Sequence, residues 1–427
     1  MDSFERCLSL PSGQSSTAAV TTAVAITLAL VSLTRLALWP RKRVIIRGAL
    51  TTTIPKLSAE EIAKIAYRPD DFPGARDVDT PYGSIRVYEY GPDEGRKVLL
   101  IHGISTSCMT LKVIADGLVA KGCRVLMFDL FGRGYSDAPG DLPYDTRLFV
   151  TQALLALASS PLAWTGEGAG LGVVGYSLGG GIAASFAATF PHLVETLVLL
   201  APAGMIRPAN IGRASRLVFT SGLVPERLLA WMTKRRLRTP IDNAVQKRRG
   251  RPYAAAATVA ASSRDGRVQP LTPIEEEEID KEEEQGQGQE QEQEDLVDVA
   301  VQEAVDPPSS SLTGPTPFEL EVTSFVHWSI DHNAGFVPAM MSTIRHGPLM
   351  GQHDCWRKLA KRKPGTTAIL MGENDTLVQH EDYEEDALPL VGGRGNVFWR
   401  IVPGGHNFPF THPRSTLKTL CEFWGLD

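Results

Sequence analysis

One short segment of the sequence combines a potential nucleophile with the backbone freedom that a sharp turn needs. Residues 175–179 read Gly-Tyr-Ser-Leu-Gly, the one G-x-S-x-G pattern in the chain. The apolar run 171–174 has the character of a buried strand, and the glycine- and alanine-rich residues 181–189 are expected to form a helix. This context predicts a strand–turn–helix element that places the Ser177 hydroxyl at a helix N-terminus, where free backbone N–H groups favour developing negative charge.

A serine hydroxyl is a poor nucleophile at neutral pH and needs a base that takes its proton. His406 ends the Gly-Gly-His run 404–406, directly after the predicted strand 397–402. His412 is the nearest alternative base, and its proline-flanked position is more typical of a surface residue. A histidine base in turn needs an anionic neighbour that fixes its tautomer and stabilises its transient positive charge.

These candidates lie among short apolar runs that alternate with helical segments. The alternation is typical of an α/β protein with a mostly parallel sheet that helices cover on both faces. The expected strands are 85–90, 97–101, 124–128, 171–174, 197–200, 368–371 and 397–402, and the expected helices are 111–120, 149–158, 181–189, 227–238 and 336–345.

Five motifs, each just past a predicted strand, together resemble those of the α/β-hydrolase superfamily. In chain order they are His-Gly at 102–103, Asp-Leu-Phe-Gly-Arg-Gly-Tyr-Ser at 129–136, the turn at 175–179, Gly-Glu-Asn-Asp at 372–375 and Gly-Gly-His at 404–406. The resemblance covers roughly residues 78–427, without the loop at about 243–316 that is expected to be disordered. It implies an α/β-hydrolase core in two parts, 78–204 and 361–427, with a helical cap inserted between them.

The resemblance also implies a role for each candidate residue. Ser177 would be the nucleophile, His406 the base, and Asp375, which follows the strand at 368–371, the orienting acid. Glu373 stays open as an alternative acid.

The tetrahedral intermediate of acyl transfer needs two hydrogen-bond donors. The resemblance implies that these donors are the backbone N–H groups of Ile104 and Leu178, whose side chains would only pack. His102 and Asp129 are expected to hold their loops rather than to react.

Between residues 200 and 368 the strand–helix alternation breaks for longer than an ordinary connection needs. We expect a cap at 205–360 that contains a disordered acidic loop at about 243–316. The apolar side chains of the cap are either plain cap core or the wall of an acyl pocket. The residues chosen as substrate-binding candidates are Trp231, Phe336 and Met340.

The N-terminal region has the composition of a membrane anchor. Residues 17–34 carry no charge, and with the residues to Trp39 the stretch 17–39 is just long enough to cross a bilayer after a tail at 1–16. Basic residues crowd its C-terminal side, which predicts a single-pass anchor with the catalytic part in the cytosol. A cleaved signal peptide is the alternative. A linker is expected at 40–77.

Composition excludes several other classes of protein. The acidic run 275–295 holds twelve acidic residues and one lysine, so the rest of the chain has a net charge of +5. Five cysteines form no CxxC pair, and no phosphate loop, metal-ligand cluster or dinucleotide fingerprint occurs, so we expect no metal and no cofactor. The mild basic charge suits an anionic membrane surface, and no motif indicates nucleic acid. Nothing in the sequence indicates a protein partner.

These observations predict a membrane-anchored serine hydrolase that cleaves carboxylic esters of lipids, such as monoacylglycerols or lysophospholipids. The anchored arrangement resembles the monoacylglycerol-lipase branch of the superfamily. A serine at the turn argues against epoxide hydrolases and haloalkane dehalogenases of the same superfamily, which have aspartate there. Two alternatives stay open: a hydrolase of a non-lipid substrate (a C–C bond hydrolase or a peptidase), and a catalytically silent binding protein.

Overall fold

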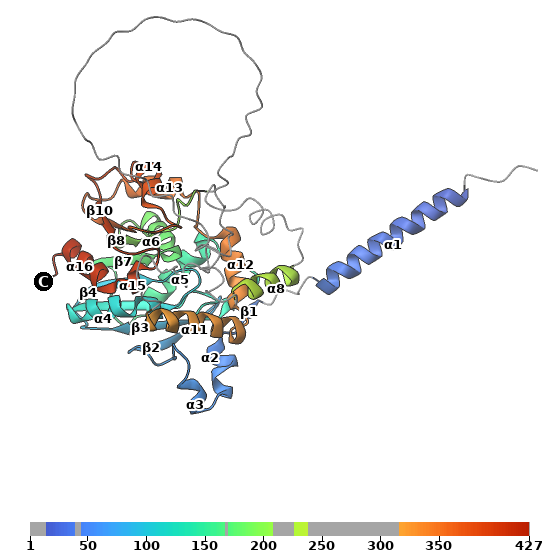
Figure 1. Cartoon of the computed structure of the whole chain (residues 1–427), viewed down its shortest axis with the longest axis horizontal. Coiled ribbons are helices and arrows are strands. Elements are labelled where there is room, and N and C mark those ends of the chain that lie inside the picture. The colour runs from blue at the N-terminus through green and yellow to red at the C-terminus, as the bar shows by residue number, and fades with distance from the viewer. Residues whose placement is uncertain (1–13, 39–43, 167–169, 208–225, 238–315, 427) are drawn as a thin grey trace, which may run out of the picture. The chain divides into compact units, whose positions relative to one another are not determined.

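The computed structural model describes residues 14–38, 44–166, 170–207, 226–237 and 316–426 of the 427-residue chain. Two sheets occur in these residues: an eight-stranded sheet and a short two-stranded ribbon. The large sheet has the strand order β10-β9-β8-β7-β4-β5-β3-β2 (Figure 1). Its strands are β2 (Ala75–Thr80), β3 (Gly83–Tyr90), β4 (Arg96–Ile101), β5 (Cys123–Phe128), β7 (Leu171–Tyr176), β8 (Val194–Leu200), β9 (Thr367–Gly372) and β10 (Phe398–Val402).

The six strands from β10 to β5 pair in parallel, and at one edge β3 pairs antiparallel with β5 and β2 pairs antiparallel with β3. The expected mostly parallel sheet is therefore confirmed. Every strand predicted from an apolar run is present, within a few residues of its expected ends. Strand β2 was not expected, because its residues 75–80 are half exposed and mostly polar.

Helices cover both faces of the sheet, because successive side chains of a strand point to opposite faces. In β4, Leu99 and Ile101 pack into one hydrophobic cluster, and Val98 and Leu100 pack into the other. The first cluster includes residues of α5 (Thr146–Ala158), α6 (Leu178–Thr189), α13 (His353–Leu359) and α14 (His380–Asp386). The second includes residues of α4 (Lys112–Ala120), α15 (Phe408–Thr411) and α16 (Pro413–Trp424), and a short 3-10 helix, η2 (Cys108–Leu111), precedes α4.

Residues 44–74, expected to belong to a linker, instead pack onto the sheet. The strand β1 (Ile45–Ile46) pairs with β6 (Ala138–Pro139), and three short helical turns follow it. These turns are α2 (Ala49–Thr52), η1 (Ile54–Lys56) and α3 (Ala59–Ile62). Tyr67 and Phe72 are buried in the second cluster. The segment was missed because its buried aromatic residues, Tyr67 and Phe72, are separated by Arg, Pro and two Asp residues, with no helical or strand period.

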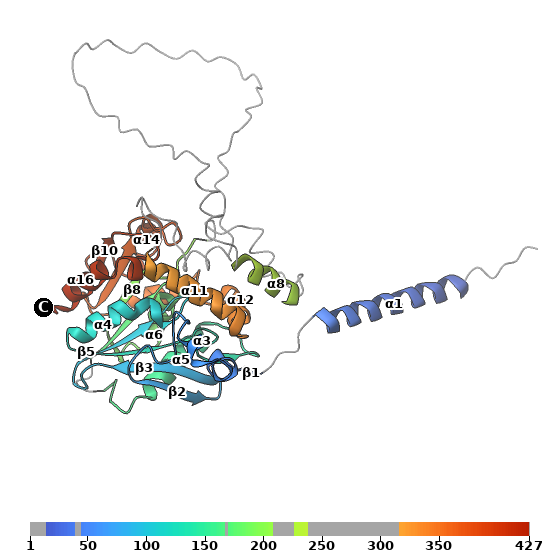
Figure 2. The same cartoon turned by 60° about the horizontal axis from the view of Figure 1, so that its bottom comes forward.

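The predicted cap contains helices α8 (Glu226–Leu237), α11 (Pro317–His332) and α12 (Phe336–His346), which lie together in both views of the chain (Figures 1 and 2). Two of them match the helices expected at 227–238 and 336–345, whereas α11 was not expected. At the start of α11, the Thr316 side chain accepts a hydrogen bond from the Glu319 N–H, and the Glu319 side chain accepts one from the Thr316 N–H. Apart from Thr316, the acidic loop predicted at 243–316 lies outside the described residues.

The predicted membrane span corresponds to helix α1 (Gln14–Leu38), except for Trp39, which lies outside the described residues. In the part of the chain that the structure describes, no helix is long and apolar enough to cross a membrane. The anchor therefore has no support from the structure and stays a prediction from the sequence.

Candidate active site

The turn between β7 and α6 holds Ser177 in a backbone conformation that few residues other than glycine adopt. Its φ and ψ are 53° and −118°, and its N–H donates to the carbonyl of Leu200 on the neighbouring strand at 3.0 Å. A Cβ on Gly175 would lie 2.1 Å from the carbonyl oxygen of Gly179, and one on Gly179 would lie 2.2 Å from that of Ile101. Both glycines are therefore required for a turn this tight.

The structure brings Ser177, His406 and Asp375 together from three separate loops at the carboxyl ends of β7, β10 and β9. The His406 Nε2 atom lies 3.0 Å from Ser177 Oγ, and its Nδ1 atom lies 2.8 Å from Asp375 Oδ2. All three residues are buried, and 5% of the Ser177 surface is exposed. This is the geometry of a hydroxyl that a histidine can deprotonate while a carboxylate holds the imidazole.

Backbone groups hold the carboxylate of Asp375 in place. Its Oδ1 atom accepts hydrogen bonds from the N–H groups of Leu377 and Val378 at 2.9 and 2.8 Å, which leaves Oδ2 for His406. The alternative acid Glu373 is exposed to solvent.

The alternative base His412 is also exposed, and its Nδ1 atom lies 3.0 Å from the Thr411 hydroxyl rather than near Ser177. Both alternatives are thus exposed, whereas the residues that hydrogen-bond to one another at the serine are buried.

Tyr176 and Asn407, which were not among the residues predicted to form the site, support His406. The Tyr176 ring packs against the imidazole with 5.5 Å between ring centroids, and its hydroxyl donates to Asn407 Oδ1 at 2.9 Å. Tyr176 precedes the serine and Asn407 follows the histidine, so the same two motifs could have pointed to them. The contact restricts the orientation of the ring that must face Ser177.

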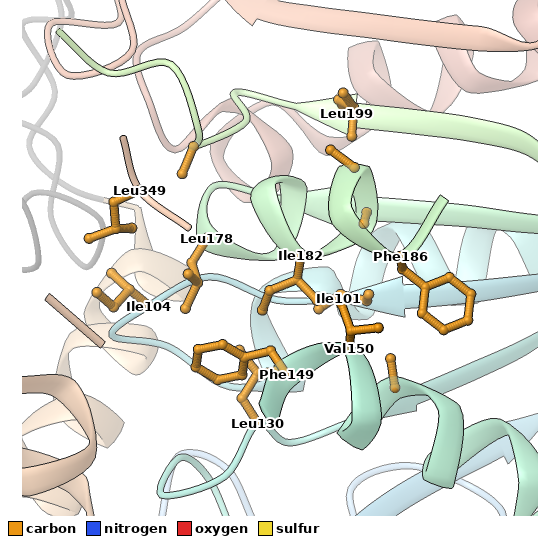
Figure 3. Packing of buried hydrophobic residues seen from close by; sticks show 14 of the residues in the cluster. Ile101, Ile104, Leu130, Phe149, Val150, Leu178, Ile182, Phe186, Leu199 and Leu349 are labelled. Carbon is orange, nitrogen blue, oxygen red and sulfur yellow. The ribbon is translucent and has the colours of Figure 1, made fainter. Parts of the chain in front are cut away.

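The loop after β4 supplies Ile104, and α6 begins with Leu178. Both side chains belong to one buried cluster at the sheet end (Figure 3). A Cβ on Gly179 would also lie 2.6 Å from the His102 carbonyl oxygen, so this loop runs directly against the start of α6.

His102 fixes the peptide that carries the Ile104 N–H. Its Nδ1 atom donates to the carbonyl of Gly103 at 2.9 Å, and its Nε2 atom accepts from the N–H of Leu130 at 2.9 Å. The Gly103 carbonyl and the Ile104 N–H belong to one planar peptide and point in opposite directions, so the bond sets the direction of the N–H. Burial and the nearby Arg133 charge lower the pKa of His102 to about 3, which keeps the ring neutral and both bonds intact.

Asp129 lies in the loop after β5 and holds two backbone segments. Its carboxylate accepts from the N–H groups of Cys108 and Tyr135, each at 3.0 Å, and from the hydroxyl of Tyr67 at 3.2 Å. Complete burial raises its pKa above the ordinary value. Its contacts are those of a loop-holding residue.

The three cap residues predicted to bind substrate lie in different surroundings. Phe336 and Met340 are fully buried on α12, in the same cluster as Ile104 and Leu178. Trp231 is 56% exposed on α8 and does not belong to that cluster. Among the described residues, no group of three or more His, Cys, Asp or Glu side chains could hold a metal ion.

Comparison with known proteins identifies the family. Residues 97–413 match a family model described as the alpha/beta hydrolase fold. The chain belongs to the α/β-hydrolase family. This α/β-hydrolase therefore has the fold that its sequence motifs predict.

Two curated relatives illustrate its similarity to other hydrolases. A serine hydrolase-like protein of Danio rerio is 29% identical over 130 residues, which are 30% of this chain and 38% of the relative. A 2-hydroxymuconate semialdehyde hydrolase of Pseudomonas sp. (strain CF600) is 34% identical over 131 residues, which are 30% of this chain and 44% of the relative. The match thus spans less than half the length of either relative.

Solved structures resemble this α/β-hydrolase in fold. A bacterial membrane phospholipase A has a TM-score of 0.52 and 18% identity, with 82% of this chain and 85% of that chain covered. The esterase RhEst1 from Rhodococcus sp. ECU1013 has a TM-score of 0.50 and 16% identity, with 83% and 100% covered.

Proposed function

We propose that this α/β-hydrolase is a serine hydrolase that cleaves carboxylic esters through an acyl-enzyme on Ser177. The observation that carries the proposal is the position of His406, which lies within hydrogen-bond distance of both the Ser177 hydroxyl and the Asp375 carboxylate. In the family to which the chain belongs, this arrangement performs nucleophilic acyl transfer.

The first half-reaction forms the acyl-enzyme. Ser177 Oγ attacks the ester carbonyl while His406 Nε2 takes the hydroxyl proton, and Asp375 stabilises the imidazolium that results. The N–H groups of Ile104 and Leu178 donate to the carbonyl oxygen as it becomes negative. Such donors contribute about 10²- to 10³-fold each to the rate.

The second half-reaction regenerates the serine. Before it begins, His406 returns its proton to the leaving alcohol and the ester C–O bond breaks, which completes the acyl-enzyme. A water molecule then attacks the acyl carbonyl with His406 again as base, and His406 passes this proton to Ser177 Oγ as the serine–acyl bond breaks. The products are a carboxylic acid and an alcohol, and no redox or metal-dependent step is needed.

As a finer proposal, the substrates are lipid esters such as monoacylglycerols or lysophospholipids. The support is the buried apolar cluster to which Ile104 and Leu178 belong, because it also includes Phe336 and Met340 of the cap. Such surroundings suit an acyl chain better than a polar substrate.

Hydrolysis of a non-lipid substrate is the second candidate, favoured by the likeness to 2-hydroxymuconate semialdehyde hydrolase. The lipid and non-lipid candidates can be separated by measuring hydrolysis of p-nitrophenyl esters with acyl chains of two to sixteen carbons, of monoacylglycerols and of 2-hydroxymuconate semialdehyde. We expect kcat/KM to rise with chain length and Ser177→Ala to lose activity against every substrate. Equal activity of Ser177→Ala and wild type would contradict the whole proposal.

A lipid substrate also gives the predicted anchor at 17–39 a purpose, because it would hold the enzyme beside its substrate in a membrane with the catalytic part in the cytosol. This location is proposed from the sequence alone. Full-length protein should stay in the membrane pellet after alkaline carbonate extraction, and Val24→Glu with Leu28→Glu should release it. Complete extraction of the wild type would contradict the anchor.

A further inference from the structure

Arg133 is a buried cation in the middle of the loop 129–137, and its position is not explained by the triad. The side chain is 0% exposed. A guanidinium group taken out of water must have its N–H groups bonded, since leaving them unpaired costs several kcal/mol. Where those bonds go therefore shows which parts of the molecule Arg133 holds together.

The three nitrogens of Arg133 bond to three different segments. Its Nε atom donates to the carbonyl of Ile104 at 2.9 Å, and one terminal nitrogen donates to the carbonyl of Phe131 at 3.1 Å. The other terminal nitrogen donates to the hydroxyl oxygen of Thr343 on cap helix α12 at 2.8 Å. That hydroxyl in turn donates to the carbonyl of Ala339 at 2.7 Å, so its proton is directed away from the guanidinium.

The bond to Ile104 completes a two-sided clamp on one residue. His102 holds the carbonyl on the N-terminal side of Ile104, and Arg133 holds the carbonyl of Ile104 itself. With the peptides on both sides fixed, the backbone angles of Ile104 have little freedom, and its N–H is held in one direction.

Burial lowers the pKa of the His102 imidazole, and the nearby Arg133 charge lowers it further, which helps to keep His102 neutral.

The bond to Thr343 connects this clamp to the cap. The loop 129–137 lies directly under α12: a Cβ on Gly132 would be 2.3 Å from the Ala339 Cβ, and Asn333 donates to the carbonyl of Gly134 at 3.2 Å. A shift of α12 would therefore displace the Arg133 guanidinium, which holds the carbonyl of Ile104.

We propose that Arg133 is a positioning residue for the oxyanion hole, which ties the loop of Ile104 to the cap helix α12 through Thr343. The inference rests on the proposed function, because it assigns Arg133 to the reaction at Ser177. Its effect is on the transition state: the Ile104 N–H meets the substrate oxygen fully only when negative charge has developed there. Loss of the clamp should lower kcat and leave KM unchanged.

The decisive experiment compares Arg133→Lys, Thr343→Val and Thr343→Ser in the full-length protein. Thr343→Val is close in shape but cannot accept the bond, whereas Thr343→Ser keeps the hydroxyl and is the matched control. Active sites are counted with a fluorophosphonate probe, so that kcat for p-nitrophenyl butyrate refers only to folded, reactive enzyme. Inhibition by an alkyl trifluoromethyl ketone, which forms a tetrahedral oxyanion on the serine, is measured in parallel.

We expect kcat per titrated site to fall about 100-fold in Arg133→Lys, the effect of a displacement of about 1 Å in a catalytic group, and about 3- to 10-fold in Thr343→Val. Thr343→Ser should stay within about twofold of wild type. KM should not change, and the ketone should weaken by the factor lost in kcat/KM, a relation that a purely structural role would not produce.

Wild-type kcat per titrated site in both Arg133→Lys and Thr343→Val would overturn the inference, as would a loss confined to KM. If Arg133→Lys does not fold, the Thr343→Val and Thr343→Ser pair decides alone. A wild-type protein that neither hydrolyses the ester nor labels at Ser177 contradicts the proposed function and the role of Arg133 with it. Normal wild-type turnover with unchanged variants contradicts the role of Arg133 only.

Discussion

Replacing Asp375 by asparagine should reverse the tautomer of His406 while leaving the loop around it intact. The Oδ1 atom of Asp375 accepts two backbone N–H groups, from Leu377 and Val378, at 2.9 and 2.8 Å. In the variant, the amide oxygen must keep both bonds, so the NH₂ group replaces Oδ2 at 2.8 Å from His406 Nδ1. Because an NH₂ group cannot accept a proton, His406 must carry its own proton on Nε2, which then cannot take the proton of Ser177.

The magnitude follows from this loss of the base. In serine hydrolases with a Ser-His-Asp triad, a change from Asp to Asn that alters only the histidine tautomer lowers kcat about 10⁴-fold. This corresponds to about 5.5 kcal/mol of transition-state stabilisation. KM should stay within about twofold, since Asp375 is buried behind His406 and the variant keeps the shape of the site. The free energy of unfolding should change little, because both backbone bonds to residue 375 remain.

The assay is steady-state hydrolysis of p-nitrophenyl butyrate at pH 7.5, with folded protein checked by circular dichroism. Glu373→Gln is the matched control: it removes a carboxylate two residues away that is exposed to solvent. We expect the control to keep kcat within about twofold. An Asp375→Asn variant that keeps more than a tenth of wild-type kcat, or a Glu373→Gln variant that loses as much as Asp375→Asn, would refute the assignment of the acid.

Two further predictions concern stability. Since folding lowers the pKa of His102 to about 3, its neutral form stabilises the fold above about pH 6.5, and this stabilisation is lost as the pH falls toward 3. Urea unfolding should therefore show wild type losing up to about 1.4 kcal/mol per pH unit more than His102→Gln between pH 6 and 4, and parallel curves would contradict this. Gly179→Ala places a Cβ 2.2 Å from the Ile101 carbonyl and should cost about 3 kcal/mol in thermal or urea unfolding, whereas Gly395→Ala, in open space, should cost less than about 1. Equal losses in the two alanine variants would contradict the steric argument.

The sequence predicted the parts of the molecule in which one physical rule dominates. Buried parallel strands are continuous apolar runs, so β4, β7 and β9 could be located from composition alone. Ser177, Asp375 and His406 each follow such a strand. In the structure, the two ring nitrogens of His406 lie 3.0 Å from Ser177 Oγ and 2.8 Å from Asp375 Oδ2. The resemblance of these motifs to those of the α/β-hydrolase superfamily, and not their position after a strand alone, singled out residues that are up to 229 positions apart.

The remaining features depend on packing that a periodic pattern does not specify. Helix α8 was expected, but its apolar residues lie on both sides: Leu229 and Leu237 are buried, while Trp231 is exposed. Periodicity identifies an apolar side chain and not the surface that it meets, so the exposure of Trp231 could not be predicted from the sequence.

Helix α11 was missed although Thr316 and Glu319 form a capping box at its start, a local signal that the preceding Pro- and Ser-rich residues concealed. Arg133 could not be assigned from sequence at all, because two of its three bonding partners, Ile104 and Thr343, become its neighbours only in the folded chain.

The most direct test of the account is to identify the atom that reacts. Full-length protein is treated with a biotinylated fluorophosphonate, digested, and analysed by mass spectrometry, with Ser177→Ala and His406→Ala treated alongside. We expect one adduct per chain on the peptide that contains Ser177, none in Ser177→Ala, and labelling slowed by at least about 10³-fold in His406→Ala. A protein that hydrolyses esters while its adduct lies on a different residue, or whose labelling is as fast without the imidazole of His406, would contradict it.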